Sequence, residues 1–139
     1  MPVEPQWIDQ EKTLIYIALE GKLDGNDFLN ADPEISALLD SVDHPVDIII
    51  DYSAQVYFSP DYAATTGQIK GMEHVNIRSV IFVGNRLAWE LFNLYTQQFR
   101  DVAFKYAYAP TFEEGRALVR SSRDGKRRTA YRPDFPELN

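Results

Sequence analysis

The fold is decided by an apolar run in the middle of the chain, Val46-Asp47-Ile48-Ile49-Ile50-Asp51. Three consecutive isoleucines break the alternation of apolar and polar residues, which is typical of a strand covered on both faces, as the strands of parallel sheets are. Pro45 precedes the run, and the residue before a proline disfavours helix, so any preceding helix has to end there. We therefore expect a buried central strand over residues 46–51.

Four further strands are predicted around this one. Residues 13–19 form an apolar, β-branched run, and residues 6–9 are expected to pair with it as an opening hairpin. Residues 76–84 form a third main strand next to 46–51. Residues 102–108 alternate large apolar residues with alanine and lysine, the pattern of a half-exposed edge strand.

Apolar residues at helical spacing lie between the strands and after the last one, over residues 28–42, 60–70, 86–99 and 111–121. Pro33 is expected to divide the first helix, with Asp32 as the N-cap of its second piece. Asn85 is a good N-cap for the third helix, and Thr111 with Glu114 forms a capping box for the last.

This alternation of strands and helices predicts an α/β fold. We expect a single-domain sandwich with a central, mostly parallel sheet of four to five strands flanked by helices. The domain is expected to span residues 1–121, and residues 122–139 to form a basic C-terminal tail.

Composition excludes several classes of protein. The 139 residues include no cysteine and only two histidines, which excludes disulfide scaffolds, thiolate metal sites and cysteine nucleophiles. The N-terminus has no basic segment followed by an apolar run, and no apolar stretch approaches the ~20 residues that cross a bilayer. A cytoplasmic protein without a membrane span is the expectation.

Charge is distributed unevenly along the chain. Residues 1–119 hold 8 basic and 18 acidic side chains, whereas residues 120–139 hold 6 basic and 3 acidic ones. An acidic body repels nucleic acid, so no nucleic-acid partner is expected for the domain. The basic segment leaves five alternatives open: contact with RNA, with phosphate, with an acidic neighbour or with the protein's own acidic body, or a solvated tail.

Residues 13–119 resemble the SpoIIAA-like, or STAS, superfamily. The resemblance is carried by residues 15–23, which are similar to the family's opening strand and turn, and by residues 46–53, a central strand that ends in Asp51-Tyr52-Ser53. Residues 79–85 and the segment Thr111-Phe112-Glu113-Glu114-Gly115 resemble the family's later strand and last helix start. The resemblance implies a STAS-like α/β domain that binds proteins, or a carrier like the lipid-carrier relatives grouped with the family.

The chain departs from this family at one functional motif. Antagonists of anti-sigma factors carry an Asp-Ser-Ser/Thr-Gly run at the start of the second helix, where a kinase phosphorylates serine. The comparable stretch here is residues 56–61, in which Pro60 stands near the phosphorylated position and Ser59 is the nearest substitute. Partner switching by phosphorylation is therefore less favoured than partner binding.

No sequence pattern predicts an enzyme. The chain lacks nucleotide-binding glycine motifs and a G-x-S-x-G nucleophile motif, and no residues have metal-ligand spacing. Both histidines precede strands, at the end of the sheet opposite to Ser53, so a hydrolase triad is not expected. We predict no catalytic residues, no metal and no cofactor.

Ligands of open α/β sheets bind beyond the carboxyl ends of the strands. The residues expected at that edge are Asp51, Tyr52, Ser53, Tyr57, Phe58, Ser59, Asn85, Arg86 and Trp89. Aromatic side chains with a few polar groups suit a protein partner or a small amphipathic ligand. The prediction is a non-enzymatic STAS-like binding or regulatory module, with a carrier of an apolar or amphipathic small molecule as the alternative.

Self-association is a further expectation. The edge strand over residues 102–108 holds one charged residue, Lys105, and the helix over residues 86–99 is rich in aromatic residues. A homodimer is predicted, in which the basic segment of one chain reaches the acidic surface of the other.

Overall fold

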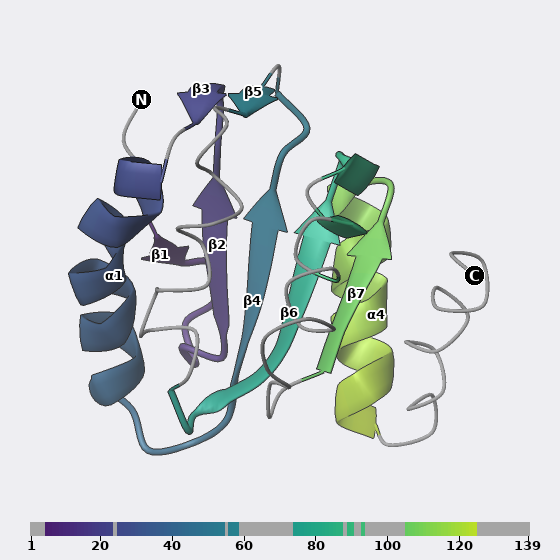
Figure 1. Ribbon diagram of the computed structural model, residues 1–139. Helices are drawn as coiled ribbons and strands as arrows, with labels where there is room; N and C mark the ends of the chain where they lie inside the picture. Colours follow the sequence, from purple (N-terminus) through teal and green to yellow (C-terminus); the bar gives the residue numbers. More distant parts are fainter. Residues whose placement is uncertain are drawn as a thin grey trace.

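The protein is an open five-stranded sheet with helices on both faces (Figure 1). The computed structural model describes residues 5–23, 25–54, 56–58, 74–87, 89–90, 93 and 105–124. The strands are β1 (Gln6–Trp7), β2 (Leu14–Ala18), β3 (Gly21–Leu23), β4 (Val46–Asp51), β5 (Val56–Phe58), β6 (Ile77–Val83) and β7 (Lys105–Ala109). The helices are α1 (Gly25–Asp40) and α4 (Phe112–Asp124).

Strand order confirms the α/β sandwich and corrects one detail of it. The main sheet has the order β1-β2-β4-β6-β7, with β4 in the centre and β6 beside it. The pairs β2–β4, β4–β6 and β6–β7 are parallel, whereas β1 pairs with β2 antiparallel. The sheet is therefore mixed and not mostly parallel, because the predicted opening hairpin adds its strand to the edge of the same sheet.

A second, two-stranded sheet was not predicted. Strand β3 pairs with β5 in parallel, and both lie beyond the carboxyl ends of β2 and β4 (Figure 1). Each has only three residues, too few to show an alternating pattern. The sequence predicted no strand at either position, so the pairing of β3 with β5 corrects it.

Strand β4 is buried along its whole length, as its three isoleucines predicted. Its even-numbered residues pack with α1 side chains such as Ile35 and Leu39, and Ile49 packs on the other face with Val119 of α4. Side chains of a strand point alternately to its two faces, so one strand serves both halves of the core.

Two local predictions are wrong. Pro33 does not divide the first helix, because α1 runs unbroken from Gly25 to Asp40 with the proline inside it. Strand β7 is at the edge of the sheet but is not half-exposed over the described residues, because Ala107 and Ala109 are buried beneath α4. The alanines are small enough for the helix to approach that face closely, while Tyr106 and Tyr108 pack against the core on the other.

The start of α4 follows the predicted capping box. The Glu114 amide donates to Thr111 Oγ1 and the Thr111 hydroxyl donates to Glu114 Oε2, both at 3.2 Å. Gly115 in the next turn allows a close approach to the sheet, since a Cβ there would lie 2.9 Å from a methyl group of Val83. The first turn of α4 is thereby fixed against the carboxyl ends of β6 and β7.

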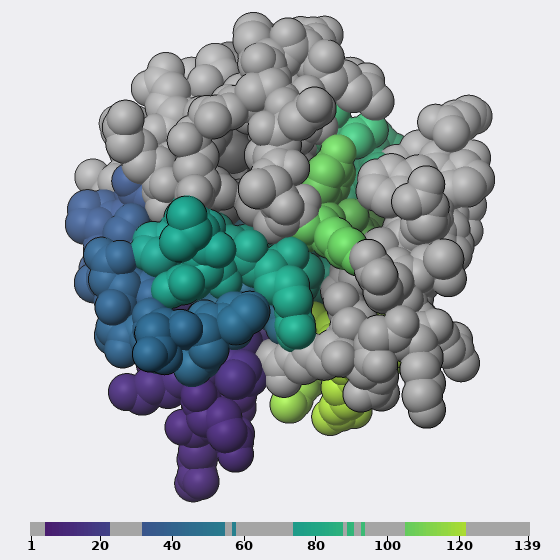
Figure 2. Space-filling view, turned by 90° about the horizontal axis from the view of Figure 1, so that it is seen from below, coloured from purple at the N-terminus to yellow at the C-terminus, as the bar shows by residue number. Residues whose placement is uncertain are grey.

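At the opposite edge, Asn76 ties the end of α1 to β6. Its Nδ2 donates to the carbonyl of Leu39 at 2.9 Å, in the last turn of the helix, and to the carbonyl of Val42 at 3.0 Å, just beyond the helix end. Its own carbonyl accepts the amide of Val46 at 2.7 Å. Figure 2 shows the segment around residue 74, in teal, seated against the end of α1 and the turn after it, in blue.

We expect Asn76→Ala to lower the free energy of unfolding by about 1–2 kcal/mol, because the side-chain hydrogen bonds to the Leu39 and Val42 carbonyls are both lost. Urea unfolding measures the change. Ser41→Ala is the control, since its hydroxyl bonds one exposed carbonyl of the same turn, that of Leu38 at 2.6 Å. Equal losses in the two variants would contradict a special role for Asn76.

Candidate functional site

The carboxyl ends of β2, β4, β6 and β7 meet at one edge of the sheet (Figure 1). Backbone bonds continue past the ends of the strands: Leu19 donates to Asp51 O at 3.0 Å, Tyr52 to Val83 O at 2.8 Å and Gly84 to Ala109 O at 3.1 Å. These bonds fix the loops that leave the strands. The first residues of the predicted site are therefore held in place by backbone hydrogen bonds.

Asp51 ends the central strand and is only 8% exposed. Its Oδ2 accepts the hydroxyl of Tyr16 at 2.6 Å, and its Oδ1 accepts the amide of Ser53 at 2.8 Å. The side chain thus ties neighbouring strand β2 to the loop after β4. The tyrosine in turn packs edge-on against Phe112 of α4, with ring centres 5.3 Å apart.

This contact changes the acidity of Tyr16. Burial, the hydrogen bond to Asp51 and the charge of Asp51 together raise the pKa of the Tyr16 hydroxyl from 10.0 to about 12. Each of these favours the neutral phenol, which donates a hydrogen bond to the carboxylate. Sequence reasoning missed this residue, because it lies 35 positions from Asp51 and inside an ordinary strand pattern.

A tyrosine whose pKa is higher in the folded state stabilises the fold most while it stays protonated. Its contribution is complete below pH 10 and is lost as pH rises from 10 to 12. We therefore expect the difference in unfolding free energy between the wild type and Tyr16→Phe to be constant up to pH 9.5 and to shrink above it. Urea titrations between pH 8 and 11.5 test this, and a difference independent of pH would contradict it.

Ser53 and Gly84 lie against each other where the loops after β4 and β6 meet. Gly84 has a φ of +87°, and a Cβ on it would lie 2.7 Å from the Cα and 2.8 Å from the amide nitrogen of Ser53. Both residues are exposed. They form an open rim next to the buried carboxylate of Asp51.

Asn85 and Arg86 begin a helical segment after β6. The Asn85 side chain accepts the amide of Leu87 at 2.9 Å, which is the predicted capping role. The guanidinium of Arg86 lies 5.7 Å from the centre of the Tyr108 ring and 3.2 Å from a carboxylate oxygen of Glu90. Leu87 is 51% exposed.

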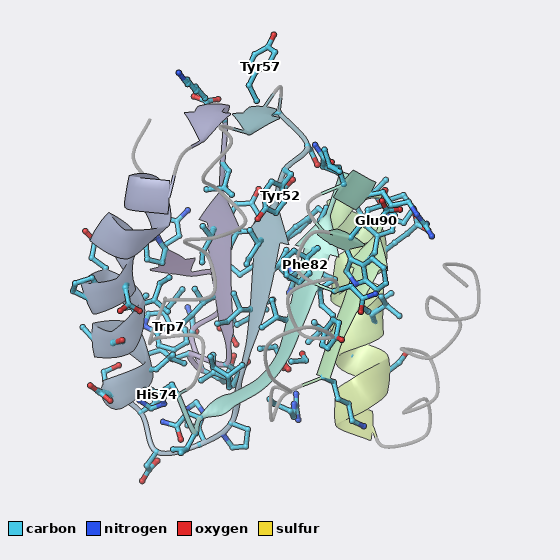
Figure 3. All side chains as sticks on the ribbon, viewed as in Figure 1. Trp7, Tyr52, Tyr57, His74, Phe82 and Glu90 are labelled. Atoms are coloured by element: carbon cyan, nitrogen blue, oxygen red, sulfur yellow. The ribbon has the colours of Figure 1, made fainter. Side chains whose placement is uncertain are left out.

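Tyr57 is the exposed aromatic residue among the predicted residues whose side chains the structure describes. It is on β5 and is 58% exposed. In Figure 3 its ring points away from the body of the protein, beyond the ends of the main strands.

The other aromatic residues predicted for the site lie elsewhere. Tyr52 is 3% exposed and stacks on Phe82 with ring centres 6.4 Å apart, and Trp89 is 0% exposed and packs against Tyr106. Both belong to the core on the α1 face, so neither provides contact surface. The side chain of Phe58 and all of Ser59 lie outside the described residues.

The described part of the chain holds no group of three or more His, Asp or Glu side chains arranged to bind a metal ion. Neither α1 nor α4, the two helices that the structure bounds, is long and apolar enough to cross a membrane.

Comparison with known proteins gives no family assignment. No family model matches the chain, and no curated protein matches it significantly.

Proposed function

We propose that the protein is a non-enzymatic binding module that contacts a protein partner through the carboxyl edge of its sheet. One observation carries the proposal: Tyr57 is 58% exposed on a strand that extends beyond the main sheet. Exposed tyrosine is enriched where proteins bind one another, because it supplies apolar area and a hydrogen bond together. The resemblance to the STAS superfamily supports the same function.

The polar groups of this edge support binding over catalysis. The two oxygens of Asp51 accept hydrogen bonds from Tyr16 and from the amide of Ser53, which fixes the loop without presenting a base to a nucleophile. Ser53 therefore acts as part of a rigid rim. A rigid, preformed edge reduces the entropy lost when a partner binds.

A photoreactive amino acid at position 57 tests the proposal. We expect one covalent adduct of defined mass in cells, and no adduct from the same group at Val75, which is 93% exposed at the opposite edge. With the purified adduct partner, Tyr57→Ala is expected to weaken binding at least tenfold, the effect typical of a central aromatic residue of an interface. Equal crosslinking from both positions, or unchanged affinity, would contradict the proposal.

The alternative function, a carrier of an apolar small molecule, gives a different result. Native mass spectrometry of protein purified from cells would then show a retained small molecule, which a module that binds only proteins lacks. Stoichiometric labelling of Ser53 by a serine-directed activity probe would instead indicate an enzyme.

A further inference from the structure

Two buried aspartates lie on β4, and they differ in their hydrogen-bond partners. Asp47 and Asp51 are 0% and 8% exposed, and being four residues apart they point to the same face of the strand. Asp47 forms two bonds with the guanidinium of Arg78, of 2.6 and 3.1 Å. Asp51 accepts only neutral donors, the Tyr16 hydroxyl and the Ser53 amide, and no cation in the described part of the chain pairs with it.

A buried carboxylate without a cation is costly, and an ion pair with good hydrogen bonds offsets that cost. Each oxygen of Asp51 accepts one of the two bonds, and a carboxylate oxygen has two lone pairs, so each can accept a second donor. The residue ends a parallel strand, the position where α/β sheets bind their ligands. Ser53, whose amide bonds Asp51, and Gly84, which lies against Ser53, are both exposed, so the carboxylate lies next to the protein surface.

We propose that Asp51 receives a guanidinium group from the partner, so that the binding edge recognises an arginine side chain. The pairing would repeat at Asp51 what Arg78 provides for Asp47. Guanidinium matches a carboxylate with two parallel N–H donors, which an ammonium group does not. The inference rests on the proposed function, because it names the chemistry of the partner at that edge.

The test uses the full chain and methylguanidinium as the probe, followed by amide chemical shifts at constant ionic strength. We expect saturable shifts of the amides of Ser53 and Gly84, and none with tetramethylammonium, which has no N–H donor. Asp51→Asn should weaken binding of the probe at least tenfold. Asp40→Asn, whose carboxylate side chain is 71% exposed at the opposite edge, should leave it unchanged.

Tyr16→Phe provides a second variant in case Asp51→Asn does not fold. It removes one donor and leaves the carboxylate, so it is expected to bind the probe several-fold more tightly. Shifts that do not saturate, or that are equal in Asp51→Asn, would overturn the proposal, as would unchanged affinity in Tyr16→Phe. Because the probe needs no partner protein, this failure is distinguishable from a failure of crosslinking at position 57.

Discussion

Gly84→Ala is expected to destabilise the protein by about 2–5 kcal/mol, a large part of the 5–15 kcal/mol that holds a domain of this size together. Two costs add. The φ of +87° is a conformation that costs a residue with a Cβ about 1–2 kcal/mol. The new Cβ would also meet the backbone of Ser53 at 2.7–2.8 Å, and relieving such overpacking typically costs another 1–3 kcal/mol.

Gly21→Ala separates these two costs. Gly21 also has a positive φ, +80°, but a Cβ there would meet nothing within 4 Å. We expect this variant to lose only the conformational part, about 1–2 kcal/mol. Urea unfolding of both variants gives the comparison. Equal losses of unfolding free energy would show that the close contact between Gly84 and Ser53 adds nothing to the cost of the substitution.

Patterns that are local in the sequence predicted most of the main sheet. The isoleucines of 46–51 predicted a central buried strand, and the capping box at Thr111 predicted the start of α4. Both depend on neighbouring residues only. The pairing of β3 with β5 depends on residues 35 positions apart, such as Gly21 and Val56, and three-residue strands carry no periodicity of their own.

For the candidate site too, some features were predictable from local sequence patterns and others were not. Its position at the carboxyl edge follows from strand direction, and Asn85 follows from capping preference. The spacing of apolar residues could not predict which aromatic residues are exposed, because it is the same for a core residue such as Trp89 as for one at an interface. Tyr57 lies on β5, outside the main sheet, where its side chain is 58% exposed.

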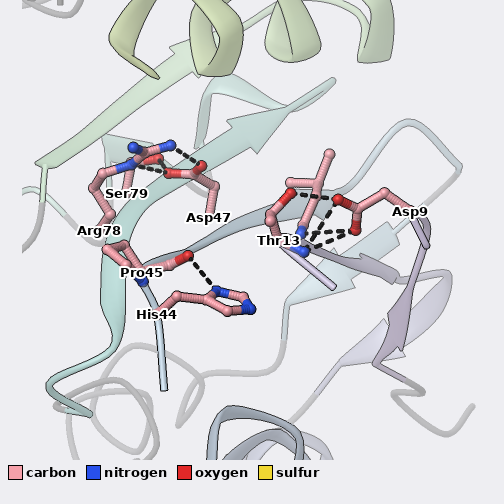
Figure 4. A network of polar contacts seen from close by, with 8 residues as sticks. Asp9, Thr13, His44, Pro45, Asp47, Arg78 and Ser79 are labelled. Carbon is pink, nitrogen blue, oxygen red and sulfur yellow. Dashed lines mark hydrogen bonds and ion pairs between the residues drawn. The ribbon is translucent and has the colours of Figure 1, made fainter. Parts of the chain in front are cut away.

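Removing the cation from the buried pair of Asp47 and Arg78 is the second large effect. Strand β6 has an irregularity at this point: Val46 pairs with Ile77, whereas Asp47 pairs with Ser79, so Arg78 is an extra residue. Such a bulge re-aims side chains, and here both Arg78 and Ser79 bond to the carboxylate of Asp47 (Figure 4). The sequence pattern alone showed Asp47 only as a polar residue inside an apolar strand.

We expect Arg78→Met to destabilise the protein by about 3 kcal/mol, because methionine keeps much of the apolar stem but removes the guanidinium that pairs with the fully buried Asp47. The value is at the low end of the range for buried pairs, since a third of the Arg78 side chain is exposed and water partly screens the charge. Arg86→Met is the control. Its pair with Glu90 is exposed on both sides, so a loss below about 1 kcal/mol is expected.

A double variant shows whether the charge itself is responsible. With Asp47→Val added to Arg78→Met, the buried carboxylate at position 47 is removed together with the guanidinium, and two apolar side chains replace the ion pair. We expect the double variant to recover at least about 1 kcal/mol relative to Arg78→Met, which corresponds to the coupling found between residues in contact. Additive losses would instead mean that the bulge is stabilised by the packing of the Arg78 stem and not by its guanidinium.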